Sequence, residues 1–443
     1  MMAKYGFFTL TFLVIANMIG AGVFTTSGFA LADLGSPRLV ILAWIVGGVI
    51  AVSGAVSYGM LSRLMPESGG EYLFLSQAAH PLLGFIAGWV SILAGFSGAI
   101  ALAAVALESY VLPGAARPEW LPANCLAAVA VVLAGWLHGL QPRLGAITQN
   151  LAVIVKLILF AAILIFAGFQ MAGDSTTLYV EGFSGNQALS PPVSLILAFA
   201  SSLVWISLSY SGFNAAVYLA GEVRDAERIV PRALVTGTVG VAIIYILLNA
   251  VFVLGPSVAQ VVGRPDIAAV AARELGGWWF EEMVRWTIVL CLTTSVLSMM
   301  MAAPRVYARM AQDGLLPGSL KLRGHSPALA TTVQVFIAIV LLVLSNLQGL
   351  LSYLGLTLSL SAALSVACLL LPSMQRQWRL KVGPTTFIYY LVPLLYILST
   401  LICAAMLAYR SPEQILGSVV TFSIGAVVYL LSGRSGLRRK PVA

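Results

Sequence analysis

The sequence predicts an all-α polytopic membrane protein with twelve transmembrane helices. The chain has 443 residues, of which 60% are hydrophobic and 9% are charged, whereas a soluble domain carries roughly 25% charged residues. Its mean hydropathy is +0.97, so lipid is its main solvent. A spanning helix needs about 20 apolar residues, and a chain of this length with short loops leaves no room for a separate soluble domain.

Apolar runs separated by short polar loops mark the predicted helices. Lipid permits only helices or closed barrels, and alternating barrel strands of about ten residues are missing from this sequence. The first run is too long for a cleavable signal, so we interpret it as helix 1. The runs cover residues 7–34, 38–63, 82–113, 120–138, 145–172, 191–220, 232–256, 279–303, 328–346, 349–372, 384–409 and 412–432. Residues 1–443 therefore form a single transmembrane domain.

The basic residues indicate the orientation of the chain and do not indicate a nucleic-acid partner. The sequence pI is 9.4, but the basic residues do not cluster on a face with aromatic residues. Most of the 24 lysines and arginines fall in loops and tails on the side of both termini, as the positive-inside rule requires of cytoplasmic segments. The predicted outer segments hold Arg38, Arg117, Arg264, Arg273, Arg285 and Arg410. We expect both termini in the cytoplasm and a bacterial-type inner (plasma) membrane.

Cysteines and histidines predict neither a metal site nor a catalytic site, and no cofactor is expected. The cysteines are Cys125, Cys291, Cys368 and Cys403, and the histidines are His80, His138 and His325. The cysteines stand singly in or beside apolar runs, without the spacing of a metal site or a disulfide framework. The histidines lie far apart, in or beside cytoplasmic loops, without a nucleophile–base pattern. A polytopic membrane enzyme is therefore a distant alternative, and a channel is disfavoured because no rings of charge or filter motif appear.

Two predicted helices contain a polar, glycine-bearing interruption near mid-length. Residues 17–24 interrupt the first helix, and residues 207–214 interrupt the sixth. Glycine costs about 1 kcal/mol relative to alanine inside a helix, a cost that is tolerated where broken backbone lines a cavity. Matching breaks in two halves indicate an inverted-repeat transporter, with residues 7–172 and 191–372 as the repeats and 384–432 appended. The alternative explanation is close packing of helices on small residues.

The two predicted breaks suit opposite ends of a free amino acid. Unwinding helix 1 exposes amides at the start of its outer half, where the positive helix end favours a carboxylate. Unwinding helix 6 exposes carbonyls that suit an ammonium. A permease for amines alone would leave the helix 1 amides without an anion. An amine/polyamine or cationic amino acid permease is kept as the alternative function.

Further short motifs lie, in chain order, at residues 20–24, 66–72, 221–222 with 231–233, and 305–308 with 313–317. Together they resemble the amino acid–polyamine–organocation (APC) superfamily over nearly the whole chain. Within the superfamily, Tyr210-Ser211-Gly212-Phe213-Asn214 is closest to the L-type (LAT-like) exchangers. The resemblance implies the leucine-transporter fold and amino acid transport by alternating access. Those exchangers often bind a heavy chain through a cysteine between helices 3 and 4, but residues 115–120 contain none, so we expect no disulfide-linked partner.

The resemblance also assigns residues to the substrate. The predicted substrate-binding residues are Met18, Gly20, Ala21, Gly22, Val23, Gly98, Leu208, Ser211, Phe213, Asn214 and Met299. Amides of residues 20–23 would face the carboxylate, and carbonyls of Met18, Leu208 and Ser211 would face the ammonium. Phe213 would form an outer gate. Asn214 and Met299 stand where arginine/agmatine exchangers place a glutamate and a tryptophan, so the mechanism of those exchangers does not carry over.

The predicted pocket wall favours neutral substrates. Its side chains would come from helices 3, 6, 8 and 10, and the candidates include Ala94, Gly95, Gly98, Ala99, Ser207, Ser209, Asn214, Ser295, Ser298 and Met299. Because none of these is a carboxylate, a cationic side chain would lack a counter-charge. An apolar cavity separates neighbouring aliphatic substrates by only ~1–3 kcal/mol per methylene, so we expect several neutral L-amino acids to be carried.

Lys156 is a lysine deep inside predicted helix 5. An ammonium at the bilayer centre costs ~2.5–3.5 kcal/mol on insertion scales. By resemblance, Lys156 occupies the place of the second sodium ion of sodium-coupled relatives, facing helices 1 and 8 and bonded to a helix 1 carbonyl near Gly20. It would either release a proton during the cycle or remain a charged strut in a sodium-independent exchanger.

Two features are predicted at the outer side. Residues 267–280 should form an amphipathic helix on the outer surface, where it would be a solvated cap. Glu108, near the outer end of helix 3, is interpreted as an interfacial residue.

Overall fold

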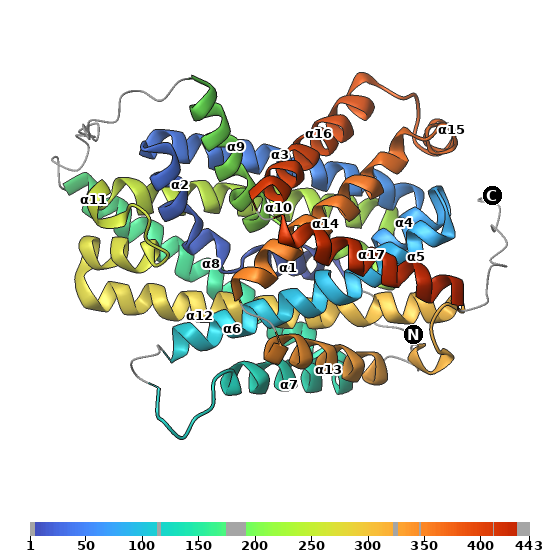
Figure 1. Ribbon diagram of the computed structural model, residues 1–443, viewed down its shortest axis with the longest axis horizontal. Coiled ribbons are helices and arrows are strands. Elements are labelled where there is room, and N and C mark those ends of the chain that lie inside the picture. Colours follow the sequence, from blue (N-terminus) through green and yellow to red (C-terminus); the bar gives the residue numbers. More distant parts are fainter. Residues whose placement is uncertain are drawn as a thin grey trace.

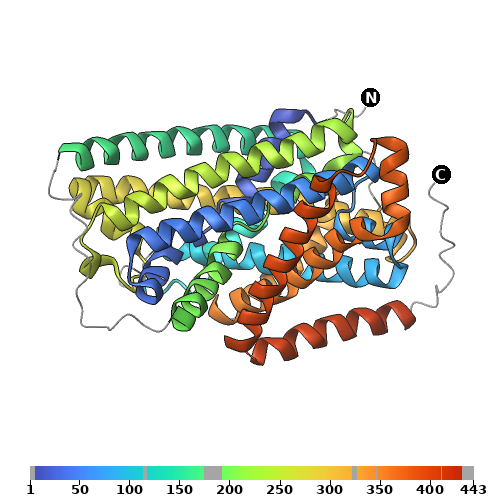
Figure 2. The ribbon, with the colours of Figure 1, turned by 90° about the horizontal axis from the view of Figure 1, so that it is seen from above.

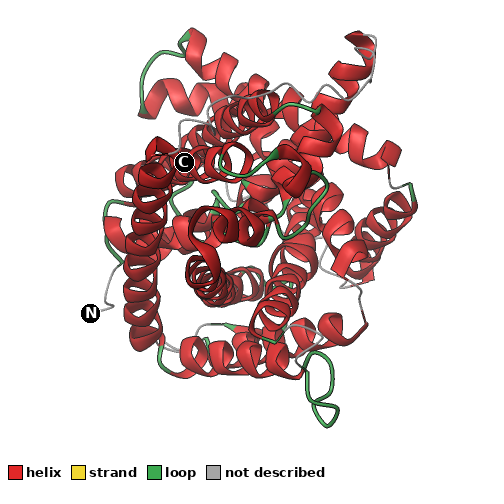
Figure 3. Ribbon diagram, turned by 90° about the vertical axis from the view of Figure 1, so that its left-hand side faces the viewer, coloured by secondary structure: helices red, strands yellow, loops and turns green. Residues whose placement is uncertain are grey.

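The structure consists of helices and loops throughout the part of the chain that it describes. This computed structural model describes residues 5–112, 117–173, 192–321, 327–344, 347–410 and 412–431. Within these ranges the β-type pairing is limited to an isolated bridge between Tyr5 and Val223. The predicted all-α class is therefore confirmed (Figure 3). His325, one of the predicted loop histidines, lies outside the described residues.

Long helices form the body of the molecule, and short ones connect them. The α-helices are α1 (Phe7–Met18), α2 (Thr26–Leu34), α3 (Pro37–Leu64), α4 (Glu71–Ala78), α5 (Pro81–Val90), α6 (Ala99–Val111), α7 (Cys125–Leu140), α8 (Pro142–Gly173), α9 (Pro192–Ser209), α10 (Ala226–Leu254), α11 (Val258–Val261), α12 (Ile267–Gln312), α13 (Ala328–Leu344), α14 (Leu347–Ala367), α15 (Pro372–Lys381), α16 (Phe387–Arg410) and α17 (Glu413–Leu431). Figure 1 shows α8 and α12 extending along the long axis. Seen from above, α10 lies between α8 and α3 (Figure 2).

Six helical segments of the described chain are long and apolar enough to cross a bilayer. They are Pro37–Leu64, Pro81–Val111, Pro142–Ala172, Ala226–Leu254, Ile267–Gln312 and Phe387–Arg410. A seventh candidate is the segment Leu354–Leu370 with α15, bent by 64°. Large apolar side chains on α8, including Leu151, Ile158 and Phe169, are more than half exposed. Such an apolar exterior requires lipid, so the chain is a multi-pass integral membrane protein.

The predicted interruptions of helices 1 and 6 are present. α1 ends at Met18, the 3-10 turn η1 (Gly22–Phe24) follows, and α2 begins at Thr26. α9 ends at Ser209, and the 3-10 segment η4 (Ala215–Glu222) continues the path. The apolar runs 7–34 and 191–220 are therefore broken helices.

The predicted outer helix 267–280 is part of a longer element. α12 runs from Ile267 to Gln312, and Gly277 inside it has a φ of 73°. Glycine accepts this left-handed conformation at little cost. With a ψ of -165° the backbone at Gly277 is not helical, so the predicted amphipathic segment and the predicted span are two helices that meet at this kink.

Candidate functional site

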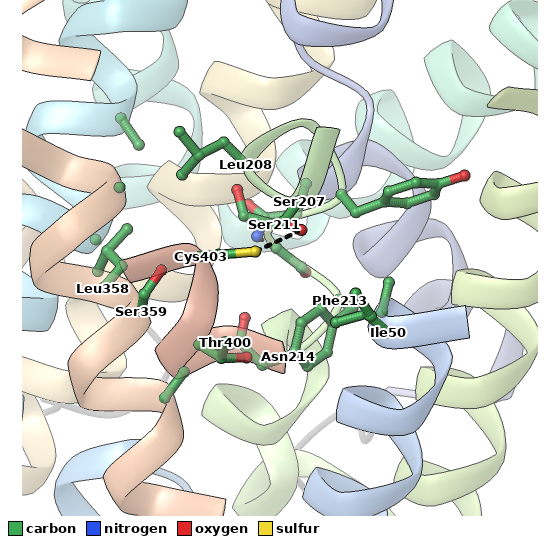
Figure 4. A pocket seen from close by; sticks show the side chains of 18 of the residues that line it. Ile50, Ser207, Leu208, Ser211, Phe213, Asn214, Leu358, Ser359, Thr400 and Cys403 are labelled. Carbon is green, nitrogen blue, oxygen red and sulfur yellow. Dashed lines mark hydrogen bonds between the residues drawn. The ribbon is translucent and has the colours of Figure 1, made fainter. Parts of the chain in front are cut away.

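A cavity of about 150 Å³ lies beside the break in helix 6 (Figure 4). Side chains that line it include Ile50, Ser207, Leu208, Ser211, Phe213, Asn214, Leu358, Ser359, Thr400 and Cys403. They come from α3, from α9 and the break after it, from α14 and from α16. Apolar groups dominate, with a few hydroxyl and amide groups among them, as is typical of small-molecule pockets. The contribution of α16 was not predicted.

The helix 6 break directly contacts the end of α1. Gly212 has a φ of 97°, and a Cβ placed there would lie 2.8 Å from the side-chain nitrogen of Asn17 and 2.8 Å from its carbonyl oxygen. The Asn17 amide donates to the carbonyl of Gly212 at 3.2 Å. Its oxygen accepts a hydrogen bond from Ser298 of α12 at 3.3 Å. Asn17, which also lines the cavity, therefore joins helix 1, the helix 6 break and α12.

The helix 1 break differs in part from the predicted set of amides, because one of the four, that of Gly20, is engaged within the break. The amide of Gly20 donates to the carbonyl of Met18 at 3.0 Å, and those of Phe24 and Thr25 donate to Ala21 and Gly22. The amides of residues 21–23 precede the first bonded amide of this turn, as at any helix start. Their geometry suits a carboxylate, while their contact with a substrate stays a prediction.

Close packing explains one glycine of helix 1 but not the other. A Cβ on Gly22 would lie 2.3 Å from the Oγ atom of Ser209 and 3.1 Å from its Cα. A Cβ on Gly20 would meet nothing within 4 Å. The small-residue alternative therefore applies to Gly22, whereas Gly20 borders open space at the break.

One tyrosine holds both breaks together. The Tyr245 hydroxyl on α10 lies 2.7 Å from the carbonyl oxygen of Met18 and 3.2 Å from that of Ser209, within hydrogen-bond distance of both. Its buried ring packs against Trp44 and Tyr210, with centroids 5.4 and 5.0 Å apart. Sequence reasoning missed Tyr245 because it stands in an unbroken apolar run with no local signal.

Apart from Gly98, the predicted substrate residues fall into two groups. Leu208, Ser211, Phe213, Asn214 and Met299 line the cavity. Met18, Gly20, Ala21, Gly22 and Val23 lie at the helix 1 break, next to the cavity wall but not among its lining residues. The structure leaves the substrate contacts of both groups as predictions.

Helix 3 approaches the cavity through an irregular segment. Residues Ser91–Gly98 form a π-helical stretch, η2, between α5 and α6, so the predicted run 82–113 is not a uniform α-helix. Gly95, Phe96 and Ala99 line the cavity, whereas Gly98 does not. Such π-helical turns are frequent at functional sites.

Phe213, on the cavity wall, lies against two tyrosines. Its ring meets Tyr58 and Tyr396 edge-on, with centroids 5.6 and 5.8 Å away. The predicted role of Phe213 as an outer gate stays a prediction.

Lys156 is fully buried on α8 and faces α12, as predicted. Its Nζ donates to the Oγ1 atom of Thr294 at 2.9 Å. The predicted bond to a helix 1 carbonyl is replaced by this one. The carbonyls of Ala16 and Ile19 instead accept from Ser295 at 3.1 and 2.8 Å. Hydroxyl groups of α12 therefore connect helix 1 and Lys156 to the same turn.

Glu71 corrects the expectation that no carboxylate lines the pocket. This buried residue begins α4 and reaches the cavity wall. Its Oε1 atom accepts from Tyr58 at 2.6 Å and from Asn214 at 3.2 Å. Its Oε2 atom accepts from Ser361 at 3.2 Å and from Ser91 at 3.4 Å.

A local signal for this position existed in the preceding glycines. Gly69 and Gly70 have φ values of 134° and 57°, and a Cβ on Gly70 would lie 2.2 Å from the ring of Tyr218. This turn needs glycine, and it directs the first residue of α4 toward the cavity.

The outer features were predicted in part. Glu108 is buried and pairs with Arg117, and it accepts from the amides of Asn124 and Ala127 at 2.8 and 2.9 Å. It therefore stabilises the start of α7 and is more enclosed than an interfacial residue.

All four cysteines are free thiols, and Cys125 is the first residue of α7.

An apolar bundle with a cavity where two broken helices meet defines a membrane transporter for a small molecule. The family model for amino acid permeases matches residues 5–431. The chain therefore belongs to the amino acid permease family within the APC superfamily, which confirms the resemblance and makes the protein a transporter and not an enzyme.

Individual relatives are similar at modest identity. The serine/threonine exchanger SteT of Bacillus subtilis is 27% identical over 352 residues, covering 76% of each chain. The large neutral amino acids transporter small subunit 2 of Rattus norvegicus is 25% identical, covering 77% of this chain and 65% of the relative. The human b(0,+)-type amino acid transporter 1 is 28% identical, covering 54% of this chain and 48% of the relative.

Proposed function

We propose that the protein transports neutral L-amino acids across the membrane by alternating access, as an exchanger or a proton-coupled symporter, and without sodium. The observation that carries the proposal is the contact of the two helix breaks beside the cavity, through Asn17 and Gly212. Relatives named as a serine/threonine exchanger and as a large neutral amino acids transporter support it.

The breaks supply complementary groups for a zwitterion. The amides of residues 21–23 begin a helical turn and favour a carboxylate. Carbonyls at Leu208 and Ser211 would take the ammonium, and the apolar part of the cavity would take the side chain. The cavity wall at Ile50, Leu208 and Leu358 suits short and medium aliphatic substrates.

We propose twelve membrane-spanning helices, with helices 1–5 and helices 6–10 as inverted repeats. The six long spans, the bent segment and five shorter apolar helices of the described chain support it. The distribution of basic residues supports cytoplasmic termini, and the proposed location is a bacterial-type inner membrane. We propose that the chain works in the lipid bilayer without a disulfide-linked heavy chain.

Lys156 would take the place of a coupling sodium ion. Its burial and its bond to Thr294 support a permanent internal cation or a proton carrier. Transport of labelled serine and leucine into proteoliposomes tests the alternatives, with internal amino acid, the pH gradient and external sodium varied independently. A requirement for internal amino acid at every pH gradient indicates exchange. Loss of the pH-gradient response in Lys156→Ala, with transport kept, indicates proton coupling through this lysine. A requirement for sodium contradicts the proposed role of Lys156.

A cationic amino acid or amine permease is the second candidate. Glu71 on the cavity wall favours it, because a carboxylate could pair with a cationic side chain. Competition against labelled leucine by lysine, and by amines that lack the carboxylate, distinguishes the candidates. The main proposal requires inhibition by neutral amino acids and weak inhibition by the matching amines.

A further inference from the structure

Glu71 is a buried carboxyl group in contact with the proposed substrate pocket. Its side chain is 3% exposed and belongs to the cavity wall. The short helix α4 carries it, outside the membrane-crossing candidates. Asn214, which follows the helix 6 break, donates to it, so the state of this carboxyl directly affects the segment proposed to hold the ammonium.

The surroundings of Glu71 contain polar groups but no described cationic partner. Its hydrogen-bond donors are Tyr58 of α3, Ser91 of η2, Asn214 and Ser361 of α14. The titratable groups that face it are the phenols of Tyr58 on α3, Tyr218 on η4 and Tyr396 on α16. Among the described residues, no lysine, arginine or histidine is paired with it. An ionised carboxylate there would be a buried charge without a counter-charge, which is costly.

The same neighbours can hold a neutral carboxyl group. Tyr58, Ser91 and Ser361 contribute hydroxyls, and a hydroxyl accepts as readily as it donates. Burial raises the pKa of the Glu71 carboxyl above its ordinary value, while the hydrogen bonds from Tyr58, Ser361, Ser91 and Asn214 act in the opposite direction. Gain and loss of a proton are therefore possible without repacking.

We propose that Glu71 is the proton-binding group of the substrate pocket and that it is protonated while the pocket holds a neutral amino acid. This inference rests on the proposed function. A neutral side chain that fills the cavity displaces the remaining water from the carboxyl group, and the proton removes the cost of leaving a charge there. Proton binding and substrate binding are then linked, and each favours the other.

The linkage has a definite sign. Because the folded-state pKa is raised, the contribution of Glu71 to stability is fully present below the unfolded-state pKa. It is lost as the pH rises through the folded-state pKa. The dissociation constant for a neutral amino acid should rise in the same direction, by up to about tenfold per pH unit for one proton.

The experiment measures equilibrium binding of labelled leucine and serine to the full chain in detergent, across acidic to alkaline pH. The wild type should bind more weakly as the pH rises, and Glu71→Gln should bind with a nearly constant dissociation constant. Glu67→Gln is the matched control, since it makes the same change on an exposed carboxylate paired with Arg309, and it should keep the wild-type pH dependence. Equal pH dependence in Glu71→Gln and wild type would overturn the proposal. So would tighter binding at alkaline pH, since that means that the charged carboxylate pairs with the substrate ammonium.

Thermal unfolding against pH, without substrate, tests the proton site separately from transport. Wild type should lose stability at alkaline pH relative to Glu71→Gln. Tyr58→Phe removes one hydrogen-bond donor to the carboxylate, so the midpoint, the pH at which half of this stability is lost, should be higher than in wild type. This variant provides the test if Glu71→Gln does not fold. An unchanged midpoint in Tyr58→Phe contradicts a proton on Glu71. If neither amino acid binds the wild type at any pH, the proposed function fails, and these unfolding curves still decide the proton site.

Discussion

Replacing Gly22 by alanine tests the contact between the two broken helices. The added Cβ would lie 2.3 Å from the Oγ atom of Ser209, 2.9 Å from its Cβ and 3.1 Å from its Cα. The hydroxyl can rotate away, but the Cα belongs to the last residue of α9 and moves only with the main chain. The helix end must shift by a few tenths of an ångström, and overpacking of this kind costs about 1–3 kcal/mol.

Gly20→Ala is the matched control, because a Cβ there meets nothing within 4 Å and its φ is not in the left-handed region. Thermal unfolding in detergent should rank Gly22→Ala below wild type and place Gly20→Ala close to it. Uptake by Gly20→Ala should still fall, because its methyl group enters the space beside the helix 1 amides. The double variant Gly22→Ala/Ser209→Gly should recover part of the stability. Equal stability of the two single variants would refute the close approach of helix 1 to α9.

Three other substitutions probe two contacts of the site and one buried ion pair outside the cavity wall. Tyr245→Phe removes the hydroxyl that reaches carbonyls at both breaks. It should lower the free energy of unfolding by about 1–3 kcal/mol, measured by thermal unfolding, and should also lower uptake. Unchanged stability and uptake would exclude that role. The Nε atom of the buried Arg305 lies 2.9 Å from a carboxylate oxygen of Glu222. Glu222→Ala removes that carboxylate. Loss of one partner of a buried pair costs about 3–5 kcal/mol, whereas a wild-type unfolding curve would contradict the pairing. Thr294→Val deprives Lys156 of the acceptor described above, so stability and uptake should both fall, with Thr293→Val, the neighbour on the same turn, as the control.

The sequence predicts those parts of the fold that depend on local patterns. Long apolar runs predicted the six long spans, and the polar glycine segments at 17–24 and 207–214 predicted both breaks, because lipid burial and helix propensity act on neighbouring residues. Asn17 is the first residue of the predicted break at 17–24, but no local pattern assigns it a role. Its contact with Gly212 depends on two segments 195 residues apart, which no local pattern reveals.

Polar residues that act across helices were the hardest to predict. Tyr245 and Glu71 have partners on three or more elements, and their roles follow from packing. The burial of Lys156 could be predicted because a lysine in an apolar run is conspicuous. The predicted partner, a helix 1 carbonyl, was wrong. The actual partner is Thr294, and the next residue, Ser295, donates hydrogen bonds to the helix 1 carbonyls.

The single phenol that spans both interruptions limits how the molecule can cycle. The Tyr245 hydroxyl on α10 lies within hydrogen-bond distance of the main chain of α1 and of α9, so we expect these three elements to move as a unit. An opening for substrate would then form on the other side of the cavity, where α14 and α16 line it. Substitutions of Leu358, Thr400 or Cys403, which line the cavity from those two helices, should change the range of substrates. The proposed contacts of the zwitterion at the two breaks should be unaffected by such substitutions.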